Sequence, residues 1–170
     1  MDTPTVAPTA DRYATMASPV GELVLTAAGD RLTGCWFATG TGRADPSAGL
    51  ARDDDALAEV RRQLEEYFAG DRREFDLDLA PEGTPFQQQV WAQLRAIPYG
   101  ETASYGEVAA ALGAPGASRA VGSANGANPI AIVVPCHRVV GADGRLTGYA
   151  GGTDRKRTLL DLERGILPLA

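Results

Sequence analysis

The sequence predicts an α+β fold, in which a small sheet-plus-helix domain over residues 1–80 is followed by a mostly helical domain over residues 81–170 that contains a helix-turn-helix. Three observations support this prediction. Short β-prone segments separated by turn signals fill the first part of the chain. Helix-start signals are concentrated in the second part. Between the two parts, residues 80–83 carry a proline and a glycine and are predicted to be a linker.

The composition is that of a folded protein with a substantial core. Of the 170 residues, 44% are hydrophobic and 22% are charged, which excludes a disordered chain and a disulfide-stapled miniprotein. The chain has no apolar run of membrane-spanning length and no signal-peptide pattern, so we expect a cytoplasmic protein without membrane contact. We therefore expect Cys35 and Cys136 to be free thiols. The single histidine, His137, excludes a zinc site built from several histidines and cysteines.

The net charge of −6 is unevenly distributed along the chain. Residues 1–80 hold 8 arginines and 15 acidic residues, whereas residues 104–157 hold 6 basic and 3 acidic residues. The acidic first part disfavours nucleic-acid binding there, but the local excess of positive charge in the second part is sufficient for a patch that faces phosphates.

The first domain is predicted to be a β-meander followed by a helix and an edge strand. Residues 1–11 lack apolar periodicity and are predicted to form a flexible tail. Three β-prone runs are predicted to form the meander, over residues 13–17, 22–27 and 32–37. Apolar residues recur at helical spacing over residues 53–68, and Gly70 ends that helix. Over residues 74–79, acidic and apolar residues alternate, which is the period of a half-exposed strand.

The second domain is predicted to begin with three helices. The sequence T-P-F-Q at residues 84–87 has the form of a capping box with proline at the first helical position, and it opens a helix that extends to about Ile97. A second capping box at residues 104–107 opens a short helix over residues 105–112, and a third helix follows over residues 117–126. Two short helices joined by a glycine-containing turn fit a helix-turn-helix.

The rest of the chain alternates between loops and short ordered segments. The apolar run I-A-I-V-V over residues 130–134 is predicted to be a buried extended segment, and P-C-H-R-V-V follows it directly. A turn over residues 141–144, a glycine-rich loop over residues 148–152 and a helix over residues 153–163 complete the prediction.

Cys136 is the candidate reactive residue, because it stands beside His137 and Arg138 and directly after a buried run. Adjacent positive charge or a hydrogen-bond relay lowers the pKa of a thiol below its ordinary value of about 8.5, so we expect a thiolate here. Adjacent residues of an extended segment point to opposite faces, which favours a water-bridged relay between thiol and imidazole over direct contact. The alternatives are a small buried cysteine, a structural histidine and an arginine that is a surface charge or a salt-bridge partner.

Two stretches of this region resemble a known family. R-A-V-G-S-A-N-G-A-N-P at residues 119–129 and I-V-V-P-C-H-R-V-V at residues 132–140 are similar to the signature of the O6-alkylguanine-DNA alkyltransferases, also called methylated-DNA–protein-cysteine methyltransferases. The resemblance covers residues 86–165 closely and residues 13–80 in outline. It implies DNA repair by irreversible, single-turnover transfer of an alkyl group from O6-alkylguanine, and from O4-alkylthymine, to Cys136, with no cofactor and no metal.

The resemblance also assigns chemical roles to individual residues. Cys136 would accept the alkyl group, His137 would remove the thiol proton through a water molecule, and Glu163 would orient the imidazole. From the sequence alone, Glu163 could equally be a charge on a helix surface. Arg119 would fill the space left by a base that is flipped out of the duplex, with a phosphate contact as the alternative. Tyr105 would donate to the departing guanine, with a core tyrosine at a helix start as the alternative.

The remaining implied roles concern DNA contact and the base pocket. Asn128 resembles a hinge residue that ties the recognition helices to the reactive segment. Small residues over 117–124 fit a close approach to the minor groove of double-stranded DNA. The candidate contact residues among them are Ala120, Gly122 and Ser123. The candidate base-pocket residues are Tyr149, Ala150, Val139 and, at the rim, Lys156.

Three other function classes are alternatives to alkyl transfer. A non-catalytic alkyltransferase-like protein would bind damaged DNA, but such proteins lack the cysteine present here at position 136. A helix-turn-helix transcription regulator would need a dimerisation element and a more basic reading helix. A cysteine hydrolase would need a histidine opposite the thiol and an oxyanion site. The predicted function is therefore alkyl transfer by a monomer that acts on double-stranded DNA containing alkylated guanine.

Overall fold

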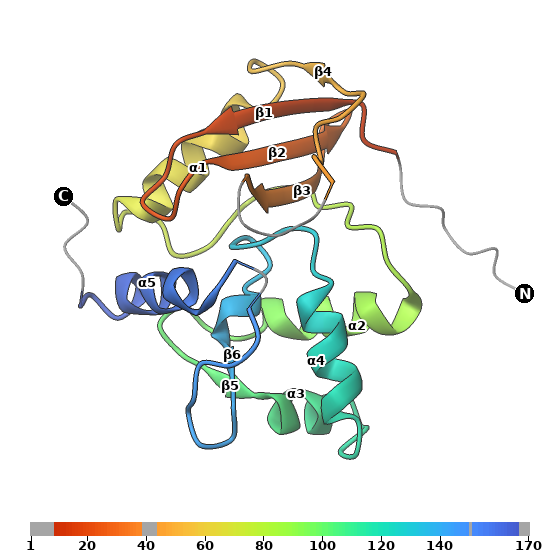
Figure 1. Cartoon of the computed structure of the whole chain (residues 1–170), viewed down its shortest axis with the longest axis vertical. Helices are drawn as coiled ribbons and strands as arrows, with labels where there is room; N and C mark the ends of the chain where they lie inside the picture. The colour runs from red at the N-terminus through yellow and green to blue at the C-terminus, as the bar shows by residue number, and fades with distance from the viewer. Residues whose placement is uncertain (1–8, 39–43, 150, 167–170) are drawn as a thin grey trace, which may run out of the picture.

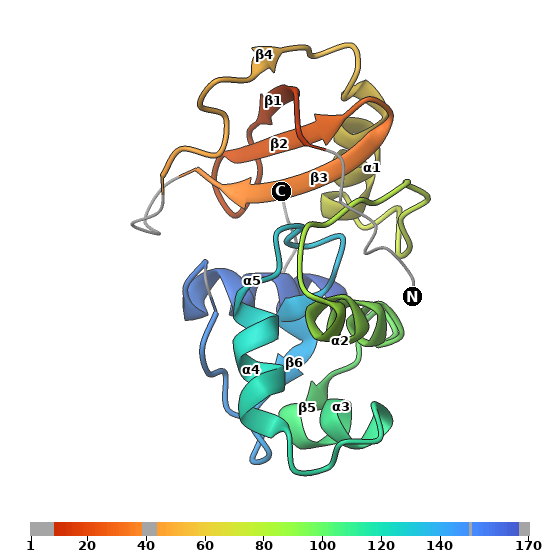
Figure 2. The ribbon, with the colours of Figure 1, turned by 90° about the vertical axis from the view of Figure 1, so that its right-hand side faces the viewer.

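The computed structural model describes residues 9–38, 44–149 and 151–166 (Figure 1). A sheet and helix α1 lie at one end of the molecule, and helices α2 to α5 lie at the other end (Figures 1 and 2). The predicted α+β class is confirmed. Most of the tail expected over residues 1–11 lies outside the described residues. Within the described ranges, no helix has both the length and the apolar character needed to cross a membrane.

The sheet has four strands in the order β3-β2-β1-β4. The strands are β1 (Arg12–Met16), β2 (Leu23–Ala28), β3 (Arg31–Phe37) and β4 (Ala51–Arg52). The first three form the predicted antiparallel meander, in which Leu25 is the partner of both Ala14 and Cys35. These three side chains are almost fully buried and belong to the hydrophobic core. β4 was not predicted, because its two exposed residues carry no β pattern.

Helix α1 (Ala58–Phe68) covers one face of the sheet (Figure 1). It begins five residues after the predicted start at Asp53, because the intervening residues form turns. Asp53 stabilises these turns by accepting a hydrogen bond from the backbone N–H of Ala56 at 3.0 Å. The acidic residues that suggested a first helical turn therefore precede the helix.

The predicted strand over residues 74–79 is wrong. Only Leu79 forms a bridge, with Leu32 of β3. The side chain of Gln63 in α1 accepts from the backbone N–H of Asp76 at 2.9 Å and donates to the carbonyl of the same residue at 3.0 Å. Because a glutamine satisfies the backbone that a neighbouring strand would otherwise bind, the alternating pattern does not produce a strand.

The first three helices of the second part lie close to their predicted positions. They are α2 (Pro85–Arg95), α3 (Tyr105–Ala111) and α4 (Ser118–Gly126), and α3 with α4 forms the predicted helix-turn-helix. The capping box of α2 is confirmed, since Thr84 Oγ1 accepts from the N–H of Gln87 and Gln87 Oε1 accepts from the N–H of Thr84. At α3, the structure shows one bond of the second predicted box, from the N–H of Glu107 to Ser104 Oγ.

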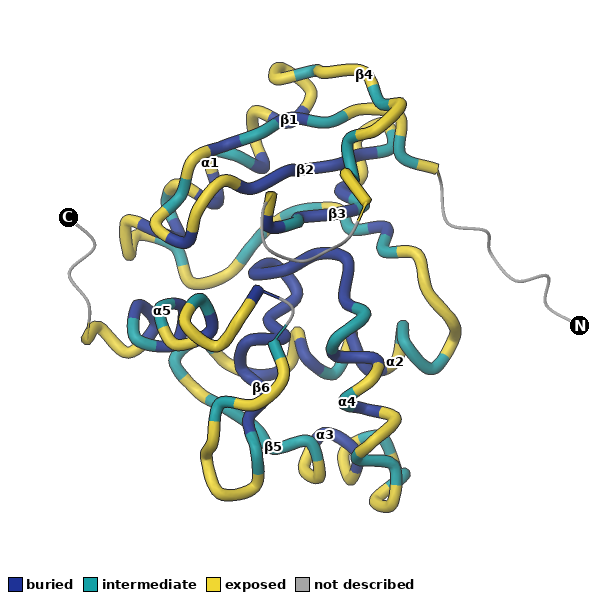
Figure 3. The backbone as a smooth tube through the Cα atoms, viewed as in Figure 1, coloured by how far each residue is buried: buried dark blue, intermediate teal, exposed yellow. Residues whose placement is uncertain are grey.

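The apolar run over residues 130–134 is buried, as predicted, but it is not extended. Ile130 bridges Cys35 at the edge of β3, and the N–H of Val134 donates back to the carbonyl of Ile130 at 3.0 Å. Ile132 has a φ of 73° and is 1% exposed. The run is therefore a tight turn that fills the space between the sheet and the helices (Figure 3).

The reactive segment follows this turn. Cys136–Arg138 forms a single turn of 3₁₀ helix, labelled η1, instead of the extended segment expected from the sequence. Next comes β6 (Val139–Val140), which pairs in parallel with β5 (Ala103–Ser104), and α5 (Thr153–Glu163) packs against η1. η1 is buried at the centre of the second part of the molecule, where α5 brings Glu163 to it (Figure 3).

Candidate active site

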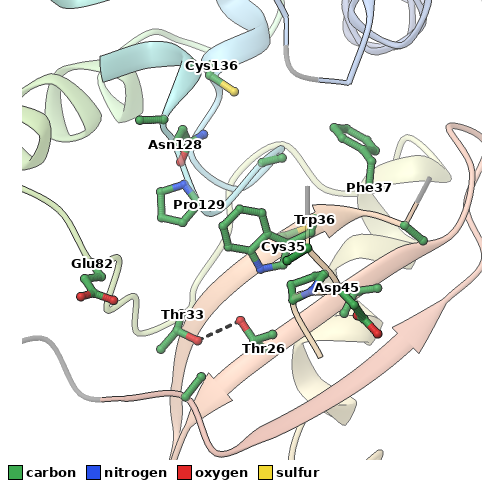
Figure 4. Close-up of a pocket in the computed structure, with 18 of the residues that line it drawn as sticks. Thr26, Thr33, Cys35, Trp36, Phe37, Asp45, Glu82, Asn128, Pro129 and Cys136 are labelled. Carbon is green, nitrogen blue, oxygen red and sulfur yellow. Dashed lines mark hydrogen bonds between the residues drawn. The ribbon is translucent and has the colours of Figure 1, made fainter. Parts of the chain in front are cut away.

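Cys136 lines a cavity of about 940 Å³ between β3 and the segment that follows α4. Figure 4 shows Cys136 and Asn128 on one side of the cavity, with Trp36 and Phe37 of β3 opposite them. Tyr149 also lines the cavity, and its ring meets Phe37 edge-on at 5.9 Å between centroids. Cys136 is only 6% exposed and is one of the residues that line this cavity.

Burial raises the pKa of the Cys136 thiol above its usual value. Asn128, the ammonium of Lys156 and the hydroxyl of Tyr149 act in the opposite direction but do not reverse the effect. The thiol is therefore neutral in the free protein at pH 7, which corrects the expectation of a standing thiolate. Any reaction at this sulfur would therefore need a base to take the proton. Both cysteines are free thiols, as predicted.

Two asparagines hold the reactive segment in place. Asn128 Nδ2 donates to the carbonyl of Val134 at 2.8 Å, and Asn128 Oδ1 accepts from the N–H of Ile130 at 3.0 Å. Asn125, which sequence reasoning missed, is buried and donates to the carbonyl of Cys136 at 3.4 Å. The end of α4 is thus joined by hydrogen bonds to the turn and to the reactive residue.

His137 is fully buried and contacts Glu163, with Nε2 and Oε2 2.7 Å apart. Burial lowers the pKa of His137 and outweighs the opposite effect of Glu163, so the imidazole is neutral at pH 7. Because an ionised carboxylate only accepts hydrogen bonds, Nε2 carries the proton and Nδ1 keeps its lone pair. His137 Nδ1 is buried and has no hydrogen-bond partner among the described residues. This nitrogen is a free base within the reactive segment.

Glu163 is buried and accepts five hydrogen bonds, which excludes the alternative of a charge on a helix surface. Arg138 provides two of them, from Nε to Oε1 at 2.8 Å and from Nη2 to Oε2 at 3.0 Å. Burial alone would raise the pKa of Glu163, but His137 and Arg138 together hold it well below the usual range. The carboxylate is therefore ionised throughout the physiological range.

Two residues that contact Glu163, Arg138 and Tyr67, were not among the predicted site residues. Arg138 is only 6% exposed, so of the two alternatives that the sequence left open, a surface charge and a salt-bridge partner, the structure shows the salt bridge. Tyr67 of α1 donates from its hydroxyl to Glu163 Oε2 at 2.6 Å. Its only signal in the sequence was a place in the apolar repeat of a helix, which does not distinguish a hydrogen-bonding tyrosine from a packed one.

The DNA-contact candidates lie on one side of α4. Arg119, Ala120 and Ser123 are exposed, and Gly122 is half-buried. Within the described part of the chain, Arg119 makes no hydrogen bond or ion pair that would hold it back from a ligand. A Cβ at Gly122 would lie 3.7 Å from the ring of Tyr105, so a small residue allows α3 and α4 to pack closely.

Of the remaining candidates that the structure describes, Tyr149 lines the cavity, whereas Tyr105, Lys156 and Val139 do not. The hydroxyl of Tyr105 lies 3.4 Å from the carbonyl of Thr147, next to the loop that carries Tyr149. Lys156 is fully buried and donates to the same carbonyl at 2.9 Å, so it is not at the rim as expected. Val139 is also fully buried and does not line the cavity. Ala150 lies outside the described residues.

Among the residues that the structure describes, no three His, Cys, Asp or Glu side chains are grouped so that they could hold a metal ion.

Comparison with known proteins identifies the family. Residues 85–165 match the model of the 6-O-methylguanine DNA methyltransferase, DNA binding domain, and residues 12–81 match that of the 6-O-methylguanine DNA methyltransferase, ribonuclease-like domain. The methylated-DNA–protein-cysteine methyltransferase of Mycobacterium tuberculosis is 54% identical over 157 residues, which cover 92% of this chain and 94% of the relative. The constitutive enzyme of Bacillus subtilis is 47% identical over 157 residues and covers 89% and 94%.

Solved structures agree with the sequence relatives. The crystal structure of Mycobacterium tuberculosis OGT in complex with DNA matches with a TM-score of 0.86 at 52% identity, over 93% of this chain and 96% of that one. A structure of the same organism's O6-methylguanine methyltransferase matches with a TM-score of 0.86 at 51% identity, over 95% and 97%. The fold, the buried Cys136 and these relatives together show that the chain belongs to the methylated-DNA–protein-cysteine methyltransferase family.

Proposed function

We propose that Cys136 takes the alkyl group from O6-alkylguanine in double-stranded DNA in one irreversible turnover, with His137 as the base and Glu163 as the residue that orients it. The observation that carries the proposal is the bare, buried Nδ1 of His137 in the reactive segment. The ionised Glu163 fixes the tautomer from the other side of the ring, at 2.7 Å from Nε2. A neutral thiol next to a neutral, oriented imidazole is suited to proton removal during attack.

The reaction balances without a cofactor. The sulfur of Cys136 forms a bond to the alkyl carbon while the bond from that carbon to guanine O6 breaks. The thiol proton passes through a water molecule to His137, and a proton is returned to the guanine ring, for which Tyr105 is the proposed donor. The product is a thioether, and a thioether is too poor a leaving group to release the cysteine. The protein is therefore consumed in the reaction.

The DNA is proposed to lie on the exposed side of α4, with its minor groove against the helix. Small side chains allow the backbone to come close, and little base identity is readable in this groove, which suits a repair protein. Because O6 is inside the duplex, the damaged base must rotate into the cavity next to Cys136. Arg119 fills the vacated space. The same pocket chemistry extends to O4-alkylthymine, which presents an alkylated oxygen in a similar position.

The two parts of the chain are proposed to have different roles. Residues 81–170 bind DNA and accept the alkyl group, and residues 1–80 support them. One chain holds the whole set of site residues, so a monomer is sufficient. Two free thiols, Cys35 and Cys136, fit a reducing cytoplasm.

The proposal is tested by weighing the intact protein after incubation with a duplex that carries one O6-methylguanine. A gain of one methylene per chain, on the peptide that holds Cys136, is expected. Cys136→Ala is expected to lose transfer and keep its affinity for DNA. Cys35→Ser is the matched control and is expected to gain the same mass as the wild type. Unchanged mass with retained DNA binding in the wild type would instead indicate a non-catalytic binder of damaged DNA.

A further inference from the structure

Tyr67 connects the first part of the chain to the reactive segment in the second. It lies in α1, under the sheet, and is fully buried. Its hydroxyl donates to Glu163 Oε2 at 2.6 Å. The same oxygen lies 2.7 Å from His137 Nε2 and 3.0 Å from Arg138 Nη2. One carboxylate oxygen therefore joins the helix of the first part to the base of the proposed reaction.

We propose that Tyr67 is a positioning residue for alkyl transfer, which acts through Glu163 on the orientation and basicity of His137. With three donors around Oε2, the carboxylate cannot rotate without breaking several hydrogen bonds at once. The imidazole that depends on it is fixed as well. This inference rests on the proposed roles of Cys136, His137 and Glu163.

Packing alone does not account for the hydroxyl of Tyr67. The ring lies in an aromatic cluster, with centroids 5.3 Å from Phe68, 5.4 Å from Phe75 and 6.2 Å from Tyr99. A phenylalanine would fill the same space. A buried hydroxyl is unfavourable unless it is hydrogen-bonded, and Glu163 is the hydrogen-bond partner that the structure gives this hydroxyl.

The expected electrical effect of the hydroxyl follows from the charges around Glu163. Arg138 and Lys156 disfavour a protonated His137, whereas the carboxylate favours it. Tyr99 is a further titratable group near Glu163, and burial together with the charge of Glu163 raises the pKa of Tyr99. The Tyr67 O–H dipole stabilises the carboxylate charge, so removing it leaves more of that charge to attract a proton on the imidazole. His137 would then become protonated at a higher pH.

The experiment compares the pH dependence of single-turnover methyl transfer in the full-length wild type and in Tyr67→Phe. The wild-type rate falls on the acid side as His137 becomes protonated. In Tyr67→Phe, the midpoint of this fall is expected to move up by about 0.5 to 1 pH unit, roughly half the effect of one lost hydrogen bond to a charged group, because the hydroxyl acts on His137 only through Glu163. Tyr99→Phe is the matched control, because it removes a hydroxyl from the same cluster that is not bonded to Glu163. Its midpoint is expected to equal that of the wild type.

A second variant keeps the test independent of folding. Replacement of Tyr67 by 3-fluorotyrosine retains the ring and makes the hydroxyl a stronger donor, so the midpoint is expected to move down. A lower melting temperature with an unmoved midpoint in both variants would overturn the inference and leave Tyr67 a purely structural residue. If Glu163→Gln also left the pH profile unmoved, the proposed relay itself would fail. If only the Tyr67 variants were without effect, the relay would stand and this inference alone would fall.

Discussion

Glu163→Gln is the substitution that separates the charge of the relay from its shape. The carboxylate now accepts from Tyr67, His137, both donors of Arg138 and the backbone N–H of Gly100. A glutamine of nearly the same size keeps one acceptor oxygen and places an NH₂ group among these donors. If that group faces His137, the imidazole must accept at Nε2 and carry its proton on Nδ1, which is the wrong tautomer for a base.

The size of the effect follows from two separate losses. Loss of a correctly oriented general base reduces the rate by about 10²- to 10⁴-fold. Removal of one partner from a buried ion pair lowers the free energy of unfolding by about 3 to 5 kcal/mol. For Glu163→Gln we expect a loss near the lower end of this range. Arg138 keeps its hydrogen bond to the carbonyl of Ile97 at 2.8 Å and its contact with the ring of Tyr99 at 5.7 Å, so its charge is not left without partners.

Both losses are measurable on the same protein. The rate is followed as single-turnover transfer from an O6-methylguanine duplex at pH 7.5, and the stability as urea unfolding. Asp161→Asn is the control on the same helix, since it removes a half-exposed carboxylate outside the relay. Its free energy of unfolding should stay within about 0.5 kcal/mol of that of the wild type. Transfer by Glu163→Gln at the wild-type rate would refute the assignment of Glu163, whatever its stability.

The remaining predictions concern the thiols, the helix surface and acid stability. Burial, reinforced by the nearby Cys136, raises the pKa of Cys35 to about 12, so iodoacetamide at pH 8.5 should label Cys136 first in peptide mass spectra; preferential labelling of Cys35 would contradict the burial argument. Arg119→Ala should slow repair of a duplex more than reaction with the free modified base, and equal slowing would count against the role in base flipping. His137 and Glu163 both have lowered pKa values in the folded protein. Their contribution to the free energy of unfolding is therefore complete above about pH 6.5. As the pH falls, it decreases first because the histidine of the unfolded chain binds a proton. Below about pH 4.3 it decreases further because the glutamate of the unfolded chain binds one as well. Urea midpoints that stay constant from pH 7.5 to pH 4 would show that the two groups are not perturbed.

Local signals predicted much of the fold. The capping box at Thr84 and Gln87 satisfies two backbone donors through contacts three residues apart, so the sequence alone contains the whole interaction. The strand predicted over residues 74–79 failed because the competing partner, Gln63, comes from α1 and carries no signal of that role. The extended segment predicted over residues 130–134 is a turn in the structure for a related reason, since a short apolar run indicates burial but not backbone direction.

The site shows the same limit. The sequence motif indicated Cys136 and His137, which are adjacent in the chain. Tyr67 was missed and the salt bridge of Arg138 stayed one of two alternatives, because their partner, Glu163, is 96 and 25 residues away and meets them only in the folded structure. A thiolate was predicted at Cys136 because its positively charged neighbours are visible in the sequence. The burial that raises the pKa of the thiol and outweighs them is not. Long-range contacts and desolvation are the parts that require coordinates.

In the proposed reaction, a neutral Cys136 thiol loses its proton to His137 as it attacks the alkyl carbon. The most direct measurement is the pH dependence of single-turnover transfer, recorded together with the thiolate absorbance of the free wild-type protein. The account predicts that the rate is already at its plateau at pH 7 while the absorbance shows a protonated thiol up to alkaline pH. A rate that instead rises in parallel with thiolate absorbance, with no contribution from a group that titrates below neutrality, would contradict it.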